Sequence, residues 1–193
     1  LRWTLKFLWS PFLEMFKTKK FFVVFTQIAS GVGFGLVALS LQLPHFFACS
    51  IALLAVIAFS GATHDIATDG VYMTELSKSD QAKYIGWQGA FYNIAKIVAS
   101  GGLVYLAGWL VKRFGGVEGA SGEVVYEANV HAWMIVMFVM AIVMISLGLY
   151  HTRMLPSGGA ATSEATSFKE TFDKLVEVIL DFFKKKHIWY YIA

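Results

Sequence analysis

The chain has 193 residues, of which 57% are hydrophobic and only 15% are charged, and its formal net charge is +3. Because soluble domains carry about a quarter of charged residues, this composition excludes an ordinary soluble domain. The small net charge also gives no reason to expect nucleic acid as a partner. Cys49 is the single cysteine, which excludes an internal disulfide and a cysteine metal site. We therefore expect an all-α, polytopic membrane protein that contacts the lipid bilayer and needs no cofactor.

The apolar residues fall in blocks of about 20, the length with which a helix crosses roughly 30 Å of hydrocarbon. In chain order these blocks predict five spans or partial spans, at about 1–13, 21–43, 46–76, 82–114 and 132–150. Residues 1–152 would form an incomplete transmembrane bundle. The first block has the character of the last turns of a longer helix, and residues 187–193 that of the beginning of another. We therefore expect the chain to be a piece of a longer protein.

A Ser/Gly/Ala/Thr-rich linker follows the last complete span, so residues 153–186 are predicted to form a central loop. Within this loop, Ser167 and Glu170 have the spacing of a capping box. Apolar residues then recur at helical spacing, which predicts an amphipathic helix over 167–185. This helix would either lie in solvent as a linker or rest along the membrane surface.

The basic residues are distributed unevenly between the two sets of loops. The loops that follow the second and fourth spans hold only Lys112 and Arg113 as basic residues, together with Glu118, Glu123 and Glu127. Since Lys and Arg collect on the cytoplasmic side, loops 14–20, 77–82 and 152–186 are predicted to be cytoplasmic and loop 115–131 to face outward. The basic residues in or beside the first set are Lys17, Lys19, Lys20, Lys78, Lys83, Arg153, Lys169, Lys174, Lys184, Lys185 and Lys186.

Two carboxylates, Asp65 and Asp69, lie in the second half of the third block, after a run of residues without any charge. Their spacing of four places them on one face of a helix, with His64 on the neighbouring row. An ionised group inside the hydrocarbon costs a few kcal/mol and usually marks an ion, proton or substrate path. The structural alternative is that these acids only cap or pair with neighbouring helices.

The fourth block contributes a cation, Lys96, within a span that returns antiparallel to the third. Counted from a loop near Ser79, Lys96 and Asn93 reach a depth similar to that of Asp65, which favours an ion pair between Lys96 and Asp65. A purely structural pair and a lysine that extends to the membrane surface are the alternatives. Gln88 and Tyr92 add hydrogen-bonding groups on the same span. The glycines of the blocks, among them Gly31, Gly35, Gly101, Gly102 and Gly108, are interpreted as sites of close helix packing.

Two segments resemble one family of transporters. Leu5-Lys-Phe-Leu-Trp-Ser-Pro11 and Thr63-His-Asp-Ile-Ala-Thr-Asp-Gly70 are similar to the end of helix 2 and to helix 4 of AmpG-type muropeptide permeases and the related acetyl-CoA transporter group, in the major facilitator superfamily. The resemblance implies that 1–13 ends helix 2 and that 21–150 covers helices 3–6, less than half of a twelve-helix transporter. It also implies a bacterial inner (cytoplasmic) membrane.

The resemblance transfers a functional role only to Asp65 and Asp69, as the acids of helix 4. His64 stands where the family commonly has Gln, and Glu14-Met15 stands where it has Asp-Arg in its gating signature. Glu14 and Lys17 are therefore the candidates for the gating loop.

Together these features predict a secondary active transporter that couples protons to symport of a small organic solute, such as a muropeptide, an amino sugar or an acyl-CoA-like compound, and that is not an enzyme. Asp65 would accept the proton, Asp69 would relay it or stabilise a gate, and Gln88, Tyr92 and Asn93 would contact the solute. The main alternative is an intramembrane transferase that holds Mg²⁺ on Asp65 and Asp69, although the chain shows no second acidic cluster. A non-transporting assembly protein on the same scaffold is a third possibility that no residue favours. The oligomeric state is not predicted.

Overall fold

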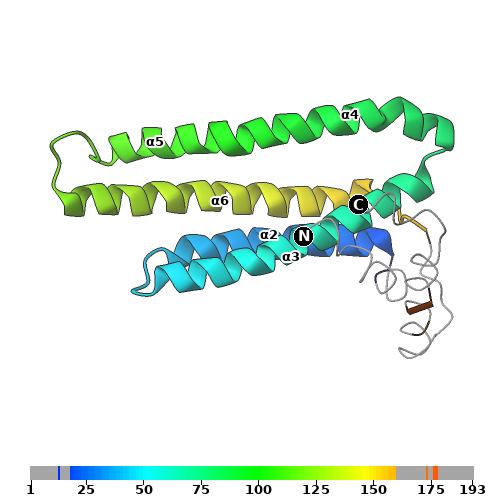
Figure 1. Ribbon diagram of the computed structural model, residues 1–193, viewed down its shortest axis with the longest axis horizontal. Helices are drawn as coiled ribbons and strands as arrows, with labels where there is room; N and C mark the ends of the chain where they lie inside the picture. The colour runs from blue at the N-terminus through cyan, green and yellow to red at the C-terminus, as the bar shows by residue number, and fades with distance from the viewer. Residues whose placement is uncertain (1–12, 14–17, 160–172, 174–175, 178–193) are drawn as a thin grey trace, which may run out of the picture.

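A computed structural model describes residues 13, 18–159, 173 and 176–177, and within these residues the chain is helical and contains no strand (Figure 1). The described part has four helices that are long and apolar enough to cross a membrane, Lys19–Ser40 (α2), Phe46–Glu75 (α3), Lys78–Arg113 and Gly122–Met154 (α6). The third of these is a continuous run of α4 (Lys78–Ile97), a π-helical turn η1 (Val98–Gly102) and α5 (Leu103–Arg113). The prediction of an all-α bundle that is integral to a membrane is therefore confirmed.

Hydroxyl side chains mark where three of these helices begin. Thr18 accepts the N–H of Phe21 at 3.3 Å, and Ser77 accepts that of Asp80 at 3.2 Å. Ser121 accepts the N–H of Val124 at 3.4 Å. Such N-caps satisfy backbone donors that a helix leaves without a partner in its first turn.

The caps correct two predicted boundaries. Because Ser121 caps α6, that helix begins at Gly122 and not near 132, and the predicted outer loop 115–131 shortens to about 114–121. The first turns of α6 carry polar residues such as Glu127, because the helix can project beyond the hydrocarbon. A prediction from hydropathy assigns such residues to a loop. Likewise α4 begins at Lys78, four residues before the predicted span 82–114.

Several predictions fall on residues that the structure does not describe. These are the span at 1–13 apart from residue 13, the gating residues Glu14 and Lys17, and the start of a further helix at 187–193. Of the predicted helix 167–185 the structure describes only Asp173, Val176 and Glu177, which are helical and exposed.

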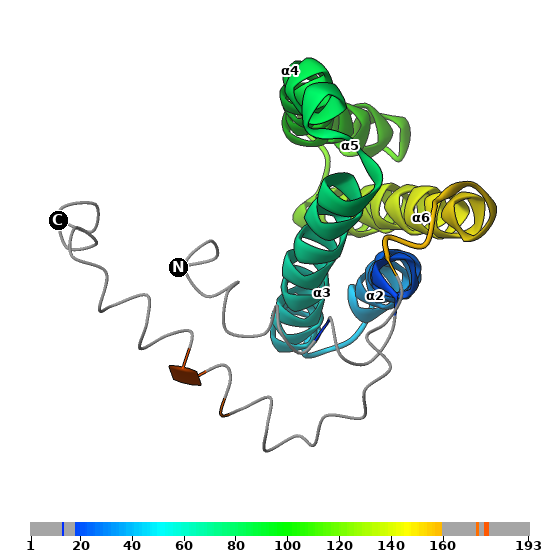
Figure 2. The same cartoon turned by 90° about the vertical axis from the view of Figure 1, so that its right-hand side faces the viewer.

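The described helices are held together by α2, which packs along both α3 and α6, while α5 packs against α6 (Figure 2). Glycines bring α2 and α6 close. A Cβ added at Gly31 would lie 2.6 Å from Ile145 Cγ1, and one added at Gly148 would lie 2.9 Å from Ile28 Cγ1. The interpretation of Gly31 as a site of close packing is confirmed. At Gly35 the nearest atom, Ala141 Cβ, is 4.0 Å away, so this position leaves room for a methyl group.

The glycines between Lys78 and Arg113 do not bring described helices close together. A Cβ at Gly101 or Gly108 would meet no atom within 4 Å, and one at Gly102 would meet only Val98 of the same helical run. Their interpretation as contact sites is therefore wrong for the described part of the chain. Gly101 and Gly102 instead belong to the π-helical turn, a local widening that is often found at functional sites.

Helix α4 stands apart from the other described helices. It meets α3 at the turn that joins them, where the Tyr72 hydroxyl donates to Gln81 O at 2.6 Å and Gln81 Nε2 donates to Leu76 O at 2.9 Å. Beyond this turn α4 has no buried residue within the described structure. Figures 1 and 2 both show it diverging from α3.

The helix ends that carry most of the basic residues lie together at one end of the bundle. The start of α2, the turn between α3 and α4 and the end of α6 lie at one end of the bundle (Figure 1). That end holds five basic residues, Lys19, Lys20, Lys78, Lys83 and Arg153, whereas the opposite end holds two, Lys112 and Arg113, together with Glu118, Glu123 and Glu127. We call the first the basic end. That the basic end faces the cytoplasm stays a prediction.

Candidate functional site

The two predicted acids lie at different depths on α3. Asp65 is half-buried and Asp69 is exposed. At 1.5 Å per residue, α3 is about 45 Å long, with Asp65 about 15 Å and Asp69 about 9 Å from Glu75 at its end. If α3 is centred on a hydrocarbon layer of about 30 Å, Asp69 lies near its boundary and Asp65 lies inside it. Asp65 is therefore the acid that the bilayer penalises more.

The predicted partners on α4 do not come together with the acids of α3. Lys96, Asn93, Tyr92 and Gln88 are all exposed, and within residues 18–159 the Lys96 side chain makes no ion pair. Two reasons account for this. The helices diverge, and the turn is centred on Ser77, so that Lys96 lies about 28 Å from it and Asp65 only about 18 Å. The predicted ion pair between Lys96 and Asp65 is therefore not formed in this structure.

The residues of α4 nevertheless form one polar row in the middle of an apolar span. Gln88, Tyr92 and Lys96 are four residues apart on a regular helix, so they share one face, and Asn93 adjoins it with its amide donating to Gly89 O at 2.9 Å. Bare lipid would not hydrogen-bond this row, because hydrocarbon offers no partner to an amide or an ammonium group. The row therefore requires a polar neighbour or water.

The polar contacts that the structure does bring together join α2 to α3 and to α6. Ser60 of α3 donates to Thr26 O at 3.0 Å and accepts from Ser30 at 3.0 Å. His151 of α6 contacts Gln27 through Nδ1 and Oε1 at 2.9 Å. Ser30, Ser60 and Gln27 are buried. These five residues form a polar seam in the interior of the helix group, where each hydrogen bond also avoids the cost of an unpaired buried group.

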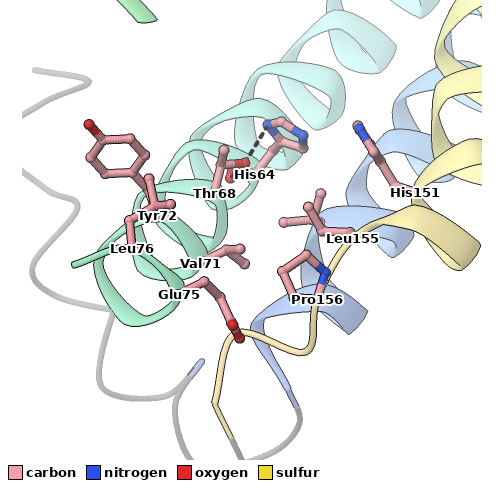
Figure 3. A pocket seen from close by; sticks show the side chains of 10 residues that line it. His64, Thr68, Val71, Tyr72, Glu75, Leu76, His151, Leu155 and Pro156 are labelled. Atoms are coloured by element: carbon pink, nitrogen blue, oxygen red, sulfur yellow. Dashed lines mark hydrogen bonds between the residues drawn. The ribbon is translucent and has the colours of Figure 1, made fainter. Parts of the chain in front are cut away.

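His64 lies beside this seam, on the face of α3 that looks toward the end of α6. Its Nδ1 is 3.5 Å from Thr68 Oγ1, and its Nε2 is buried without a hydrogen-bond partner. In Figure 3 the rings of His64 and His151 lie on opposite sides of a cavity. A buried polar atom without a partner costs about 1–3 kcal/mol, so this nitrogen marks a site where a ligand or water is favoured.

The cavity itself has a volume of about 310 Å³ and lies at the basic end, between α2, α3 and the end of α6 (Figure 3). Its apolar walls are Val23, Val71, Leu76, Leu155 and Pro156, and its polar lining is His64, Thr68, Tyr72, Glu75 and His151. The volume is at the lower end of the range typical of small-molecule sites. We refer to it as the histidine cavity.

The segment after α6 folds back over the histidine cavity and is held by backbone hydrogen bonds. Gly158 N donates to Glu75 Oε1 at 2.7 Å, and Lys20 N donates to Ser157 O at 3.2 Å. Gly158 has φ +72°, and a Cβ there would lie 2.8 Å from Val71 Cγ2. Only glycine meets both the left-handed conformation and the close approach without strain. The ends of α2, α3 and α6 are thus joined at one point.

Sequence analysis found His64 but missed Gln27, Ser30, Ser60 and His151. The available signal was the spacing of the polar residues in the second block, because Gln27 and Ser30 are three apart and share a helix face. That face is recognisable only once α3 and α6 are known to pack against it. No group of three or more His, Cys, Asp or Glu residues able to hold a metal ion is present among the described residues.

Comparisons with models of protein families, with curated proteins and with solved structures gave no match for this chain.

Proposed function

We propose that the protein is a secondary active transporter, and not an enzyme, that couples protons to the symport of a small organic solute across a membrane. One observation carries the proposal. An ionisable pair, His64 and Asp65, lies inside a helix of 30 residues that is apolar along its first half, next to a polar seam and a cavity. Ionisable groups at such depth are rare and mark substrate or proton paths.

The proposed roles follow from depth and exposure. Asp65 accepts the coupled proton, because it is the acid of α3 that lies deeper in the span, where ionisable groups are rare and mark proton or substrate paths. Asp69 lies about one turn nearer the basic end and exchanges the proton with water. The exposed row of Gln88, Tyr92, Asn93 and Lys96 supplies the polar contacts for the solute.

The superfamily and the solute class belong to the proposal through the resemblance of 5–11 and 63–70 to the muropeptide and acetyl-CoA transporters. In transporters of this kind the substrate and the coupling ion bind near the midplane, between helical repeats. A muropeptide, an amino sugar and an acyl-CoA-like compound are the solutes that this resemblance favours, and a bacterial inner membrane is the location.

The test is uptake into liposomes that contain the purified full-length protein. Labelled muropeptide, N-acetylglucosamine and acetyl-CoA are supplied in turn, with the outside more acidic than the inside or at equal pH. The proposal predicts that at least one solute accumulates only with the gradient and that a protonophore stops the accumulation. Equal uptake with and without the gradient, or uptake of none of the three, contradicts it.

The Mg²⁺-dependent transferase requires a second cluster of acidic residues near Asp65 and Asp69. No described residues form one, and the exposure of Asp69 differs from that of Asp65, which is unlike a pair that shares one ion. Nothing in the described structure favours this reaction over transport.

A further inference from the structure

Lys96 is the one charged residue between Lys83 and Lys112, within the helical run Lys78–Arg113. At 1.5 Å per residue, Lys96 lies about 20 Å from the first of these lysines and about 24 Å from the second. Its stem of four carbons is too short to bring the ammonium group to either end of this uncharged stretch. The charge of Lys96 is therefore held within the hydrocarbon, where an unpaired cation is strongly disfavoured.

No residue in the described part of the chain supplies a counter-ion for Lys96. Its side chain is exposed and makes no ion pair within residues 18–159. Asp65, the acid that the sequence placed at a similar depth, lies on α3, which diverges from α4 (Figures 1 and 2). Charged residues inside a membrane are generally paired. The anion that pairs with Lys96 therefore comes from outside the described helices.

The neighbours of Lys96 on the same face of α4 are polar but uncharged. Gln88 and Tyr92 precede it at intervals of four residues, and neither side chain makes a hydrogen bond within the described structure. Asn93 donates one amide hydrogen to Gly89 O at 2.9 Å, which leaves its second hydrogen and its carbonyl oxygen available. From Gln88 to Lys96 the row extends about 12 Å along the helix. The row therefore offers one positive charge at the end farther from the basic end, and neutral donors and acceptors along the rest.

A glycine leaves this face of α4 open. Gly89 lies four residues before Asn93 and seven before Lys96, so it belongs to the same face. A Cβ added at Gly89 would meet no described atom within 4 Å. A solute can therefore approach the helix backbone beside the row, and a large side chain at this position would cover the row without disturbing a described contact.

From these observations we propose that the solute is an organic anion, and that Lys96 selects it by pairing with its carboxylate or phosphate group. Gln88, Tyr92 and Asn93 hydrogen-bond the uncharged polar part of the same molecule. The inference rests on the proposed function, which assigns the solute contacts to this row. It adds the sign of the charge on the solute, because an uncharged solute would leave Lys96 without a counter-ion.

Binding to the purified full-length protein in detergent tests the charge directly and needs no gradient. Two pairs of probes are titrated by calorimetry at neutral pH. N-acetylmuramic acid is compared with its methyl ester, which lacks the charge of the carboxylate, and N-acetylglucosamine 6-phosphate is compared with N-acetylglucosamine. Hydrogen bonds to charged groups are stronger than those between neutral groups. At least one anion is therefore expected to bind at least tenfold more tightly than its neutral counterpart, and the pair that shows this preference identifies the group as a carboxylate or a phosphate.

Two results overturn the inference, and they differ in what they imply for transport. Equal affinities within both pairs leave the proposed function standing, because gradient-driven uptake of a neutral solute still satisfies it. The absence of saturable binding by all four probes overturns the inference together with the assignment of the solute contacts to the row.

Substitutions of lysine locate the charge that selects the anion. K96M keeps the length of the side chain but removes its charge, so the preference for the anion is expected to disappear while the neutral probe binds as before. K96R keeps the charge and is expected to retain the preference. K83M, on the same helix at the basic end, is the matched control and is expected to leave the preference unchanged. A preference that persists in K96M refutes the role of Lys96.

A second pair of variants tests the face of α4 without changing any charge. G89L places a large side chain beside the row and is expected to weaken all four probes about tenfold or more. G108L is the matched control, because a Cβ at Gly108 also meets no described atom within 4 Å but lies on α5, and it is expected to weaken none. Equal affinities in G89L and G108L refute the location of the site, whether or not K96M folds.

Discussion

The close approach of α2 and α6 at Gly31 makes a quantitative prediction for one methyl group. In G31A the new Cβ would lie 2.6 Å from Ile145 Cγ1, a side-chain atom that can rotate away. It would also lie 3.0 Å from Ala141 O and 3.2 Å from Ile145 N, backbone atoms that move only if the helices separate. Such overpacking costs about 1–3 kcal/mol.

The control for this change lies on the same helix. G35A places its methyl group 4.0 Å from Ala141 Cβ, an ordinary contact. Both substitutions replace a glycine inside α2, so the gain of up to about 1 kcal/mol in helix propensity is common to both. The difference between the two variants therefore isolates the packing cost, and G31A should be less stable than G35A by about 1–3 kcal/mol.

The assay is thermal unfolding of wild type, G31A and G35A in one detergent, followed by circular dichroism. For a chain of this size about 1 kcal/mol corresponds to a shift in Tm of about 2–4 °C. G35A should unfold at or above the wild-type Tm, and G31A several degrees below G35A. If G31A is as stable as G35A, then α2 and α6 do not approach as described, and the arrangement of the polar seam between them is incorrect as well.

Two further predictions concern the seam and the sidedness of the bundle. S60A removes one interhelical donor and leaves Ser30 without its partner, so it should lower the free energy of unfolding by about 1 kcal/mol. The control is S100A, whose hydroxyl is exposed and donates within its own helix to Lys96 O, and it should change the free energy of unfolding little. Equal effects of the two variants in the unfolding assay would mean that the seam contributes nothing to stability. With Cys49 replaced by Ala, a membrane-impermeant maleimide should label E118C in intact cells and S157C only after permeabilisation, and the reverse pattern would invert the predicted orientation.

The spans were predictable from the sequence because hydrocarbon thickness sets the length of a helix and leaves a strong signal. The starts of α4 and α6 were misplaced because they depend on Ser77 and Ser121 as caps, and hydropathy does not register a cap. A helix that continues beyond the hydrocarbon also carries polar residues that resemble a loop. The corrections therefore concern the helix ends and leave the identity of the spans unchanged.

The candidate site was less predictable, for a different reason. Asp65 and His64 were identifiable because an ionisable residue in an apolar run is conspicuous within one segment. The contacts between Ser30 and Ser60 and between Gln27 and His151 join different helices, and their geometry depends on the rotation of each helix in the bundle. The ion pair of Lys96 with Asp65 was inferred from depth alone. Depth does not determine whether two consecutive helices stay together after their turn, and α3 and α4 diverge.

The central claim is that a carboxylate within the membrane span serves to move a proton with a solute. The most direct test compares D65N with E118Q in the liposome uptake assay, at matched amounts of reconstituted protein. Asn keeps the size of the side chain but cannot ionise, whereas Glu118 is an exposed residue outside the spans. The account predicts that D65N loses accumulation driven by the pH gradient while E118Q keeps it. Accumulation at the wild-type level in D65N would contradict the account.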